Sequence, residues 1–291
     1  VILINKKRQS SRRLSNHTQL AQVFEVLGSN TNPILTQLAK TRRALFVEGK
    51  DFQILGKFAR KLGLNQIGNR QDFAVVIVEG FNPERIRSLK TGIETTLGAK
   101  IVSAAILDRD YRSDEESAAI AKGCRAFCNY VTIHKCKEIE NFLLVADAID
   151  RAASRKIIDH GKRTGKNKSY TPVAGKVLSS FSNSKKSYIT SQFLSESRRF
   201  HRENSPKIDE TKVSEKTLNM IDELWPDENA RLRLISGKEA LVIINQNLQK
   251  NYDISVTPTS IIDAMRADEI PSEMKVLLDF LKCFAATSTK I

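Results

Sequence analysis

Short apolar runs alternate with amphipathic stretches between residues 44 and 133, and this alternation is the most regular feature of the chain. Four continuous apolar runs are typical of strands buried in a parallel sheet: 44–47, 73–78, 101–107 and about 126–133. Between them lie three segments with the pattern of helices: 52–62, 86–97 and about 113–122. This succession predicts an α/β fold, an open parallel sheet with helices on both faces.

The two ends of the chain show other patterns. Residues 1–5 read as part of a strand, and residues 19–28 as a short helix closed by a glycine. Because the chain starts within such a strand and without methionine, we expect a fragment of a longer protein. Beyond residue 141 the alternation stops, and helical patterns return at 215–224 and from 236 to the end. The second part is therefore expected to be mostly helical.

Apolar runs and cysteines restrict the class of protein. No apolar run approaches the ~18 residues of a membrane span, and the start does not have the order of a signal peptide. The spacings of the four cysteines fit no zinc ribbon or finger: Cys124, Cys128, Cys136 and Cys283. We expect a cytoplasmic protein with reduced thiols and no membrane partner.

Positive charge is concentrated in one stretch. The net charge is +14, and residues 151–207 carry 14 Lys or Arg against three Asp or Glu. Such an excess favours a polyanionic partner such as nucleic acid, although lysine can also serve only to keep a protein soluble. Aromatic residues are interleaved with the basic ones, and residues 161–168 read as a basic loop. Eight residues are expected to contact DNA phosphates: Lys162, Arg163, Lys166, Lys168, Lys185, Lys186, Arg198 and Arg199.

Acidic residues follow two of the predicted strands. Asp108 and Asp110 would project to one side if the extended conformation continues, and a divalent cation would neutralise them. Glu48 ends another strand, and Gly49 allows a sharp turn into the next helix. Strand ends of this kind hold the ligand sites of open parallel sheets, although Asp is also common there for turn formation. His134 is expected to be an ordinary buried histidine.

Two further segments allow a structural and a functional interpretation. Glu138 and Glu140 precede an apolar segment, where acids either favour a helix N-terminus or bind metal. Ser236 and Glu239 form the pattern of a capping box, which explains both without any function. The box leaves Lys238 unexplained. This lysine is either solvated or placed to bind an anion at the first helical turn.

These motifs resemble a known family. Glu-Gly after one strand and Asp-x-Asp after a later one resemble the Toprim signature of topoisomerases, bacterial primases and nucleases. Residues 46–51, 106–110 and 138–144 are similar to successive motifs of the overcoming-lysogenization-defect (OLD) nucleases, and the resemblance covers about residues 44–150. It implies two Mg²⁺ or Mn²⁺ ions held by acidic residues, with Lys238 facing the scissile phosphate. The residues that the resemblance assigns to metal binding are Glu48, Asp51, Asp108, Asp110, Glu138 and Glu140.

One position departs from the family pattern. Many relatives have a second acid four residues after the glutamate, where this chain has Phe52. Either Asp51 substitutes for it from the first turn of the helix, or that ligand is missing.

The resemblance also implies a function and a domain order. It implies a DNA endonuclease of phage defence that hydrolyses phosphodiesters with two ions ~3.5–4 Å apart, Glu48 and Lys238 being catalytic. It makes this chain the C-terminal region of an ATPase-nuclease, with the ATPase domain as partner and a homo-oligomer forming through the missing region. There is no phosphate-loop motif, so ATP should not bind here. The expected parts are 1–40, the tail of the ATPase; 41–150, the Toprim domain; 151–235, a basic helical DNA-binding module; and 236–291, a helical segment completing the site.

Two alternatives remain. A topoisomerase would need a nucleophilic tyrosine on a separate domain, and none of the five tyrosines has such a setting. The other alternative is a DNA-binding or assembly module whose metal site has decayed, which is consistent with Phe52.

Overall fold

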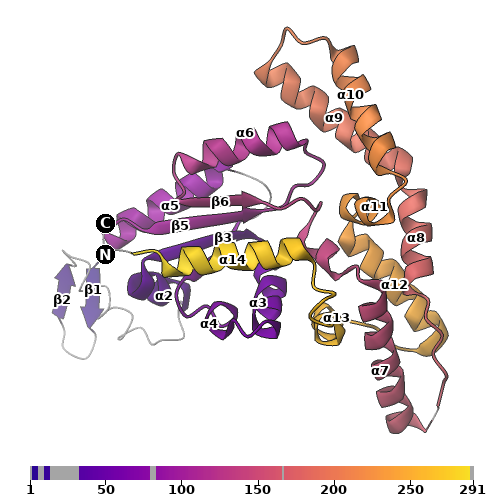
Figure 1. Cartoon of the computed structure of the whole chain (residues 1–291). Coiled ribbons are helices and arrows are strands. Elements are labelled where there is room, and N and C mark those ends of the chain that lie inside the picture. Colours follow the sequence, from indigo (N-terminus) through magenta and orange to yellow (C-terminus); the bar gives the residue numbers. More distant parts are fainter. Residues whose placement is uncertain (1, 6–9, 14–32, 79–82, 166, 289–291) are drawn as a thin grey trace.

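A computed structural model of the chain describes residues 2–5, 10–13, 33–78, 83–165 and 167–288 (Figure 1). Its centre is a sheet of four parallel strands in the order β4-β3-β5-β6. The strands are β3 (Arg43–Glu48), β4 (Ala74–Val78), β5 (Val102–Leu107) and β6 (Tyr130–Ile133). All four predicted strands are present, and the open parallel sheet with helices on both faces is confirmed.

Side chains alternate between the two faces of the sheet, as the two-residue period of a strand requires. In β3, Leu45 and Val47 enter one hydrophobic core, whereas Ala44 and Phe46 enter the other. The second core is covered by α2 (Pro33–Thr41), α5 (Pro83–Leu97) and α6 (Asp114–Arg125). The first is covered by α3 (Asp51–Lys61), the short α4 (Asn65–Gly68) and α14 (Ser272–Ala286). Both faces are thus buried, which explains the continuous apolar runs.

The last helix was not expected on the sheet. In α14, Phe284 packs against Phe73 and Tyr130, with ring centroids 5.5 and 6.0 Å apart. The C-terminal segment therefore returns to cover β3 and its neighbours beside α3 (Figure 1). The first core also runs on into the helical half, so hydrophobic packing is continuous across residue 150.

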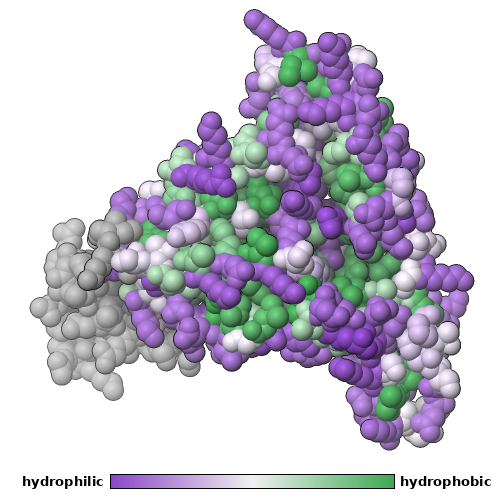
Figure 2. Space-filling model, in the orientation of Figure 1, coloured by the Kyte–Doolittle hydropathy of each residue, from purple (hydrophilic) through white to green (hydrophobic). Residues whose placement is uncertain are grey.

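The helical half follows β6 through the 3₁₀ helix η1 (Ile139–Leu143). Its helices are α7 (Ala146–Thr164), α8 (Ala174–Ser184), α9 (Lys186–Asn204), α10 (Glu210–Leu224), α11 (Glu228–Leu234), α12 (Gly237–Tyr252) and α13 (Pro258–Ala264). The α9–α10 hairpin projects from the body, and the face shown in Figure 2 is largely hydrophilic there. The mostly helical second part is confirmed.

Several local predictions need correction or lie outside the described residues. The expected basic loop at 161–168 is helical up to Thr164, and Gly165 closes α7 with φ +73°. The strand expected at 1–5 is β1 (Ile2–Asn5), which pairs antiparallel with β2 (Ser10–Arg13). The helix expected at 19–28 lies outside the described residues.

Two remaining expectations concern the cysteines and the membrane. Cys124, Cys128, Cys136 and Cys283 are all free, as expected. Among the described residues, none of the helices combines the length and apolarity that crossing a membrane requires.

Candidate metal centre

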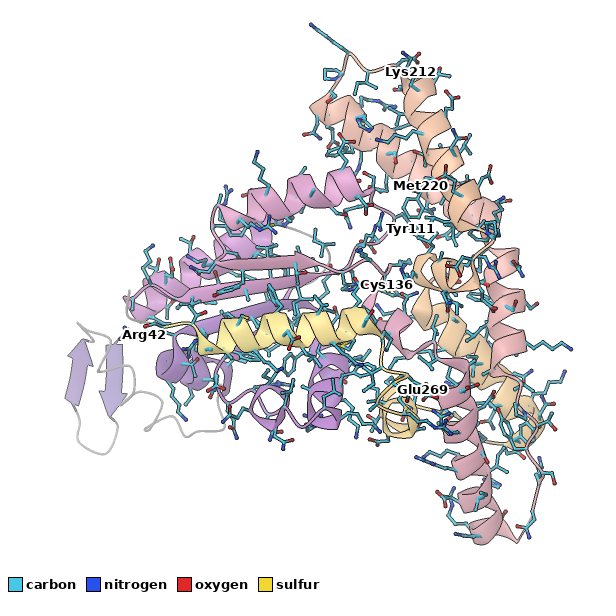
Figure 3. All side chains as sticks on the ribbon, in the orientation of Figure 1. Arg42, Tyr111, Cys136, Lys212, Met220 and Glu269 are labelled. Atoms are coloured by element: carbon cyan, nitrogen blue, oxygen red, sulfur yellow. The ribbon has the colours of Figure 1, made fainter. Side chains whose placement is uncertain are left out.

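Five carboxylates gather where β3 and β5 end and where η1 and the first turn of α3 meet them. We call this cluster the acidic centre; its members are Glu48, Asp51, Asp108, Asp110 and Glu140. Tyr111 and Cys136, labelled in Figure 3, lie at this junction between the sheet and the helical half. The carboxyl ends of parallel strands share one sheet edge, which is why residues 60 positions apart in sequence meet here.

The turn after β3 brings Asp51 into the acidic centre. Gly49 has φ +42°, a conformation that suits glycine, and the chain turns there directly into α3. Asp51 is buried at 6% exposure and interacts electrostatically with Asp108, Glu140 and Glu48. Phe52 points into the core instead, with its ring 5.7 Å from that of Phe73. Of the two possibilities for the departure at Phe52, the geometry favours substitution by Asp51.

The segment after β5 does not stay extended. Asp110 has φ +52°, in the left-handed region, so the expected projection of Asp108 and Asp110 from one extended strand is wrong. Both carboxylates nevertheless act on Glu48. Asp108 Oδ1 lies 2.8 Å from Nε2 of the buried His134, and Asp110 Oδ2 accepts a hydrogen bond from Arg112 Nη1 at 2.8 Å. His134 is thus buried as expected, but its partner is a candidate ligand.

Burial and mutual repulsion disfavour the charged forms of these acids. Burial, followed by Asp108 and Asp110, raises the pKa of Glu48 to about 7. Burial, followed by Asp108, Glu140 and Glu48, raises the pKa of Asp51 to about 8. Burial also raises the pKa of Glu140. Such shifts are characteristic of sites that a cation or a proton must neutralise.

Two buried carboxylate oxygens that accept no hydrogen bond in the described part of the chain also indicate that this site requires a cation or a proton. Glu48 Oε1 and Glu140 Oε2 are buried and accept no hydrogen bond from the described residues, and the only described cation that pairs with Glu140 Oε2 is Lys238, at 3.6 Å. A buried acceptor without a partner is costly, and a bound cation satisfies it. Among the described side chains, no three acids, histidines or cysteines converge on one point at ligand distance. The donor set therefore fits a divalent ion in chemistry, and binding requires these side chains to rotate.

Glu138 differs from Glu140, although both come from the same motif. Its Oε1 accepts hydrogen bonds from Ser236 Oγ at 2.9 Å and from the Lys238 backbone N–H at 2.7 Å. Its Oε2 accepts one from Lys137 Nζ at 3.1 Å. Burial raises the pKa of Glu138, but these donors outweigh burial and hold it below its ordinary value. Glu138 therefore ties η1 to α12, and its oxygens are already occupied.

The start of α12 places Lys238 against η1. Ser236 Oγ caps the helix by accepting from the Glu239 N–H, but the Glu239 carboxylate pairs with Lys185 Nζ at 2.8 Å, so only half of the expected capping box forms. Lys238 Nζ lies 3.5 Å from Glu138 Oε2 and 3.6 Å from Glu140 Oε2. Burial lowers the pKa of Lys238, but Glu140 and Glu138 outweigh it and raise that pKa, so the ammonium stays charged.

Two residues that sequence reasoning left without a role hold this arrangement. A Cβ on Gly237 would lie 2.6 Å from the Asn141 nitrogen and 2.7 Å from the Glu140 carbonyl carbon, so only glycine fits. Asn141 Nδ2 donates to the carbonyls of Leu232 and Ile235, at 2.7 and 2.9 Å. The glycine before Lys238 was the available sequence signal for the first contact. Asn141 gave no signal, because its acceptors are main-chain atoms about 90 residues away.

The expected DNA contacts are spread over the helical half. Lys162 and Arg163 are exposed in the last turn of α7, which is about 28 Å long at the α-helical rise and leads away from η1. Lys166 lies outside the described residues. Lys168 contacts Asp253 at 3.7 Å, and Arg198 bonds Ser214 Oγ at 3.0 Å.

The other three expected contacts carry acidic partners. Lys185 pairs with Glu239, and Lys186 pairs with Asp222 at 2.7 Å. Arg199 contacts Glu116 at 3.3 Å, which joins α9 to α6. The structure therefore does not bring the seven described residues of this set together in one patch.

Comparison with known proteins gives one structural likeness. No protein-family model matches the sequence, and no curated protein matches it. Among solved structures, the C-terminal region of the OLD protein of Xanthomonas campestris pv. campestris is similar at 15% identity and a TM-score of 0.35. The match covers 84% of this chain and 96% of that one. At this TM-score the likeness carries no argument about chemistry, which must come from the site itself.

Proposed function

We propose that this chain is a divalent-metal-dependent nuclease that cleaves DNA. The observation that carries the proposal is the acidic centre, where five carboxylates meet at a sheet edge beside one charged lysine. Like charges at this density are unfavourable without a cation. Their raised pKa values and two unsatisfied oxygens support a site built for positive charge.

The proposed ligands are the members of the acidic centre, with Glu138 left out because Ser236, Lys137 and the Lys238 backbone occupy its oxygens. All-oxygen ligation suits Mg²⁺ or Mn²⁺ better than zinc. When bound, two such ions would activate a water molecule and stabilise the leaving oxygen of a phosphodiester.

Lys238 is proposed to bind the scissile phosphate. Its side chain is 57% exposed, so the ammonium can reach a ligand while Glu138 and Glu140 keep it charged. A preorganised cation stabilises the negative charge that builds on phosphorus during hydrolysis. His134 is proposed as a positioning residue, since its Nε2 holds one Asp108 oxygen and fixes where the other points.

DNA as the substrate rests on charge. The net charge is +14, and basic side chains line the helical half beside the acidic centre. Polyanion binding through phosphates follows from such a balance.

Plasmid nicking tests the proposal. Supercoiled DNA should become open-circular or linear with Mg²⁺ or Mn²⁺ and stay intact with EDTA. Asp108→Asn should stop cleavage, whereas the control Asp159→Asn, an exposed acid on α7, should cut normally. Because the acids do not converge in the conformation described, the second candidate is a DNA-binding or assembly module whose metal site has decayed. DNA binding with neither metal binding by calorimetry nor nicking would favour that candidate and contradict the nuclease.

A further inference from the structure

A groove between α8 and α12 leads away from Lys238. It encloses about 660 Å³, and one face of each helix lines it. Val177 and Phe181 of α8 and Ile243 of α12 form its apolar floor, and Lys176 and Lys250 stand at its rim. None of the described residues that line it is acidic. We call it the basic groove.

The basic groove continues into an exposed aromatic surface. Phe181 belongs to both, because Lys185 Nζ lies 5.0 Å from its ring centroid and 5.7 Å from that of Tyr188. Tyr188 is 51% exposed, so part of its ring is open to a ligand. It meets Tyr111 edge-to-face at 6.2 Å, a contact that uses at most one face of its ring.

Tyr188 and Lys185 are each linked to the proposed active site by a contact with a residue next to it in sequence. Tyr111 directly follows Asp110 of the acidic centre, and Lys137 covers its ring at 5.3 Å. Lys185 pairs with Glu239 at 2.8 Å, and Glu239 directly follows Lys238. A strand whose phosphate sits at Lys238 therefore reaches Tyr188 and Lys185 within its next nucleotides.

We propose that Tyr188 and the basic groove bind an unpaired strand of DNA, so that the enzyme acts on substrates with single-stranded nucleotides beside the scissile phosphate. Single-stranded sites combine aromatic rings that stack on bases with a positively charged groove that follows the backbone. Paired bases in a duplex offer no free face to Tyr188. This inference rests on the proposed function for the position of the scissile phosphate, but strand binding itself can be measured alone.

Binding without cleavage is the first test. With EDTA present, wild-type protein should bind a fluorescent oligothymidylate more tightly than a blunt duplex of equal length. Tyr188→Ala should weaken oligothymidylate binding about 5- to 150-fold, the scale of one base–aromatic stack. Tyr188→Phe and Tyr188→Trp keep a ring and should stay near wild type. Ile158→Ala removes another exposed apolar side chain, on α7, and should have no effect.

Substitution of Lys176 and Lys250 gives a second, independent test of strand binding. Lys176→Gln with Lys250→Gln should flatten the salt dependence of oligothymidylate binding by about 0.7 log unit per log unit of salt for each phosphate that the variant no longer neutralises. Equal weakening of single-stranded and duplex binding in Tyr188→Ala, or no weakening at all, would overturn the proposal. Wild-type protein that prefers single strands but never nicks DNA would contradict the nuclease alone. Metal-dependent cleavage without that preference would contradict this inference alone.

Discussion

The acidic centre and the helical half differ in how far their charges are compensated by opposite charges within the fold. In the acidic centre, five carboxylates accumulate with only Lys238 and Arg112 against them, among the described contacts, and the pKa values of Glu48 and Asp51 rise accordingly. In residues 151–207 of the helical half, six of the 14 basic residues pair with acids outside that stretch: Arg151, Lys168, Lys185, Lys186, Arg199 and Arg202.

This difference shows that a charge excess counted along the sequence does not locate a ligand. The +11 excess of residues 151–207 is partly compensated by Glu269, Asp253, Glu239 and other acids that the fold brings close. Uncompensated charge in the folded protein is the better guide, because only that charge needs an external partner. Such charge remains in the acidic centre, and Lys176 and Lys250 line the basic groove without an acid among its described lining residues.

The largest effect is expected from a member of the acidic centre. Asp51→Asn should reduce metal-dependent nicking to background, because Asp51 is buried among three other acids and is the proposed substitute for the ligand that Phe52 cannot provide. Melting temperature should not fall, since the substitution removes repulsion rather than core packing. Nicking assays beside Asp159→Asn measure this. Normal cleavage by Asp51→Asn would show that Asp51 does not substitute for the acid that relatives have at the position of Phe52.

The next largest effect is expected from Lys238, and it tests whether this cation beside the acidic centre acts on substrate. Lys238→Ala should lower cleavage ~10²–10³-fold, the scale of losing one preorganised stabilising group. Stability should change by only a few tenths of a kcal/mol, since the site is half exposed and alanine favours helix.

Two controls separate catalysis from capping at this helix start. Lys122→Ala, an exposed lysine of α6, should leave cleavage unchanged. Ser236→Ala removes the cap and should cost ~1 kcal/mol of stability. Wild-type cleavage by Lys238→Ala would show that this lysine is a solvated surface residue without a role in cleavage.

The sequence predicted the strands and their acidic ends, but it did not predict the turn and the tertiary contacts that complete the acidic centre. The sheet and the positions of Glu48, Asp108 and Asp110 followed from apolar runs and from the rule that parallel strands end at one edge. The left-handed turn at Asp110 did not follow, because carboxylate spacing says nothing about φ. Contacts of α14 with the sheet and of His134 with Asp108 depend on tertiary packing and had no local signal.

Gly237 connects the two halves, and its substitution is expected to disturb both to a smaller extent. An added Cβ would collide with main-chain atoms of Glu140 and Asn141, which cannot move as a flexible side chain would. Gly237→Ala should therefore destabilise the protein by about 1–3 kcal/mol, as overpacking usually does, and displace Lys238 from η1. Gly123→Ala in α6 is the matched control: its Cβ meets nothing within 4 Å, so that variant should gain stability. Equal melting temperatures for the two variants would contradict the close approach at Gly237.

A further effect is the pH dependence that the acidic centre gives to folding without metal. Glu48 and Asp51 have ordinary pKa values of 4.5 and 3.8 but about 7 and 8 in the folded chain. The folded state thus binds more protons than the unfolded state between about pH 4 and pH 8, so the free energy of unfolding falls as pH rises through that window.

Divalent metal should oppose this fall, because the ion takes the place of the protons and binds the deprotonated acids more tightly at high pH. Saturating Mn²⁺ at about 100 times its Kd should add about 2.7 kcal/mol, or about 5 °C in Tm, at pH 8. The gain should be smaller at pH 5.5, where protons compete with the ion. Thermal melts of wild type with EDTA or Mn²⁺ at both pH values measure this. The double variant Glu48→Gln with Asp51→Asn should lose most of the pH slope and the Mn²⁺ response, and Asp159→Asn should keep both. A metal-free protein that is more stable at pH 8 than at pH 5.5 would show that these carboxylates are compensated within the fold, as the lysines of the helical half are.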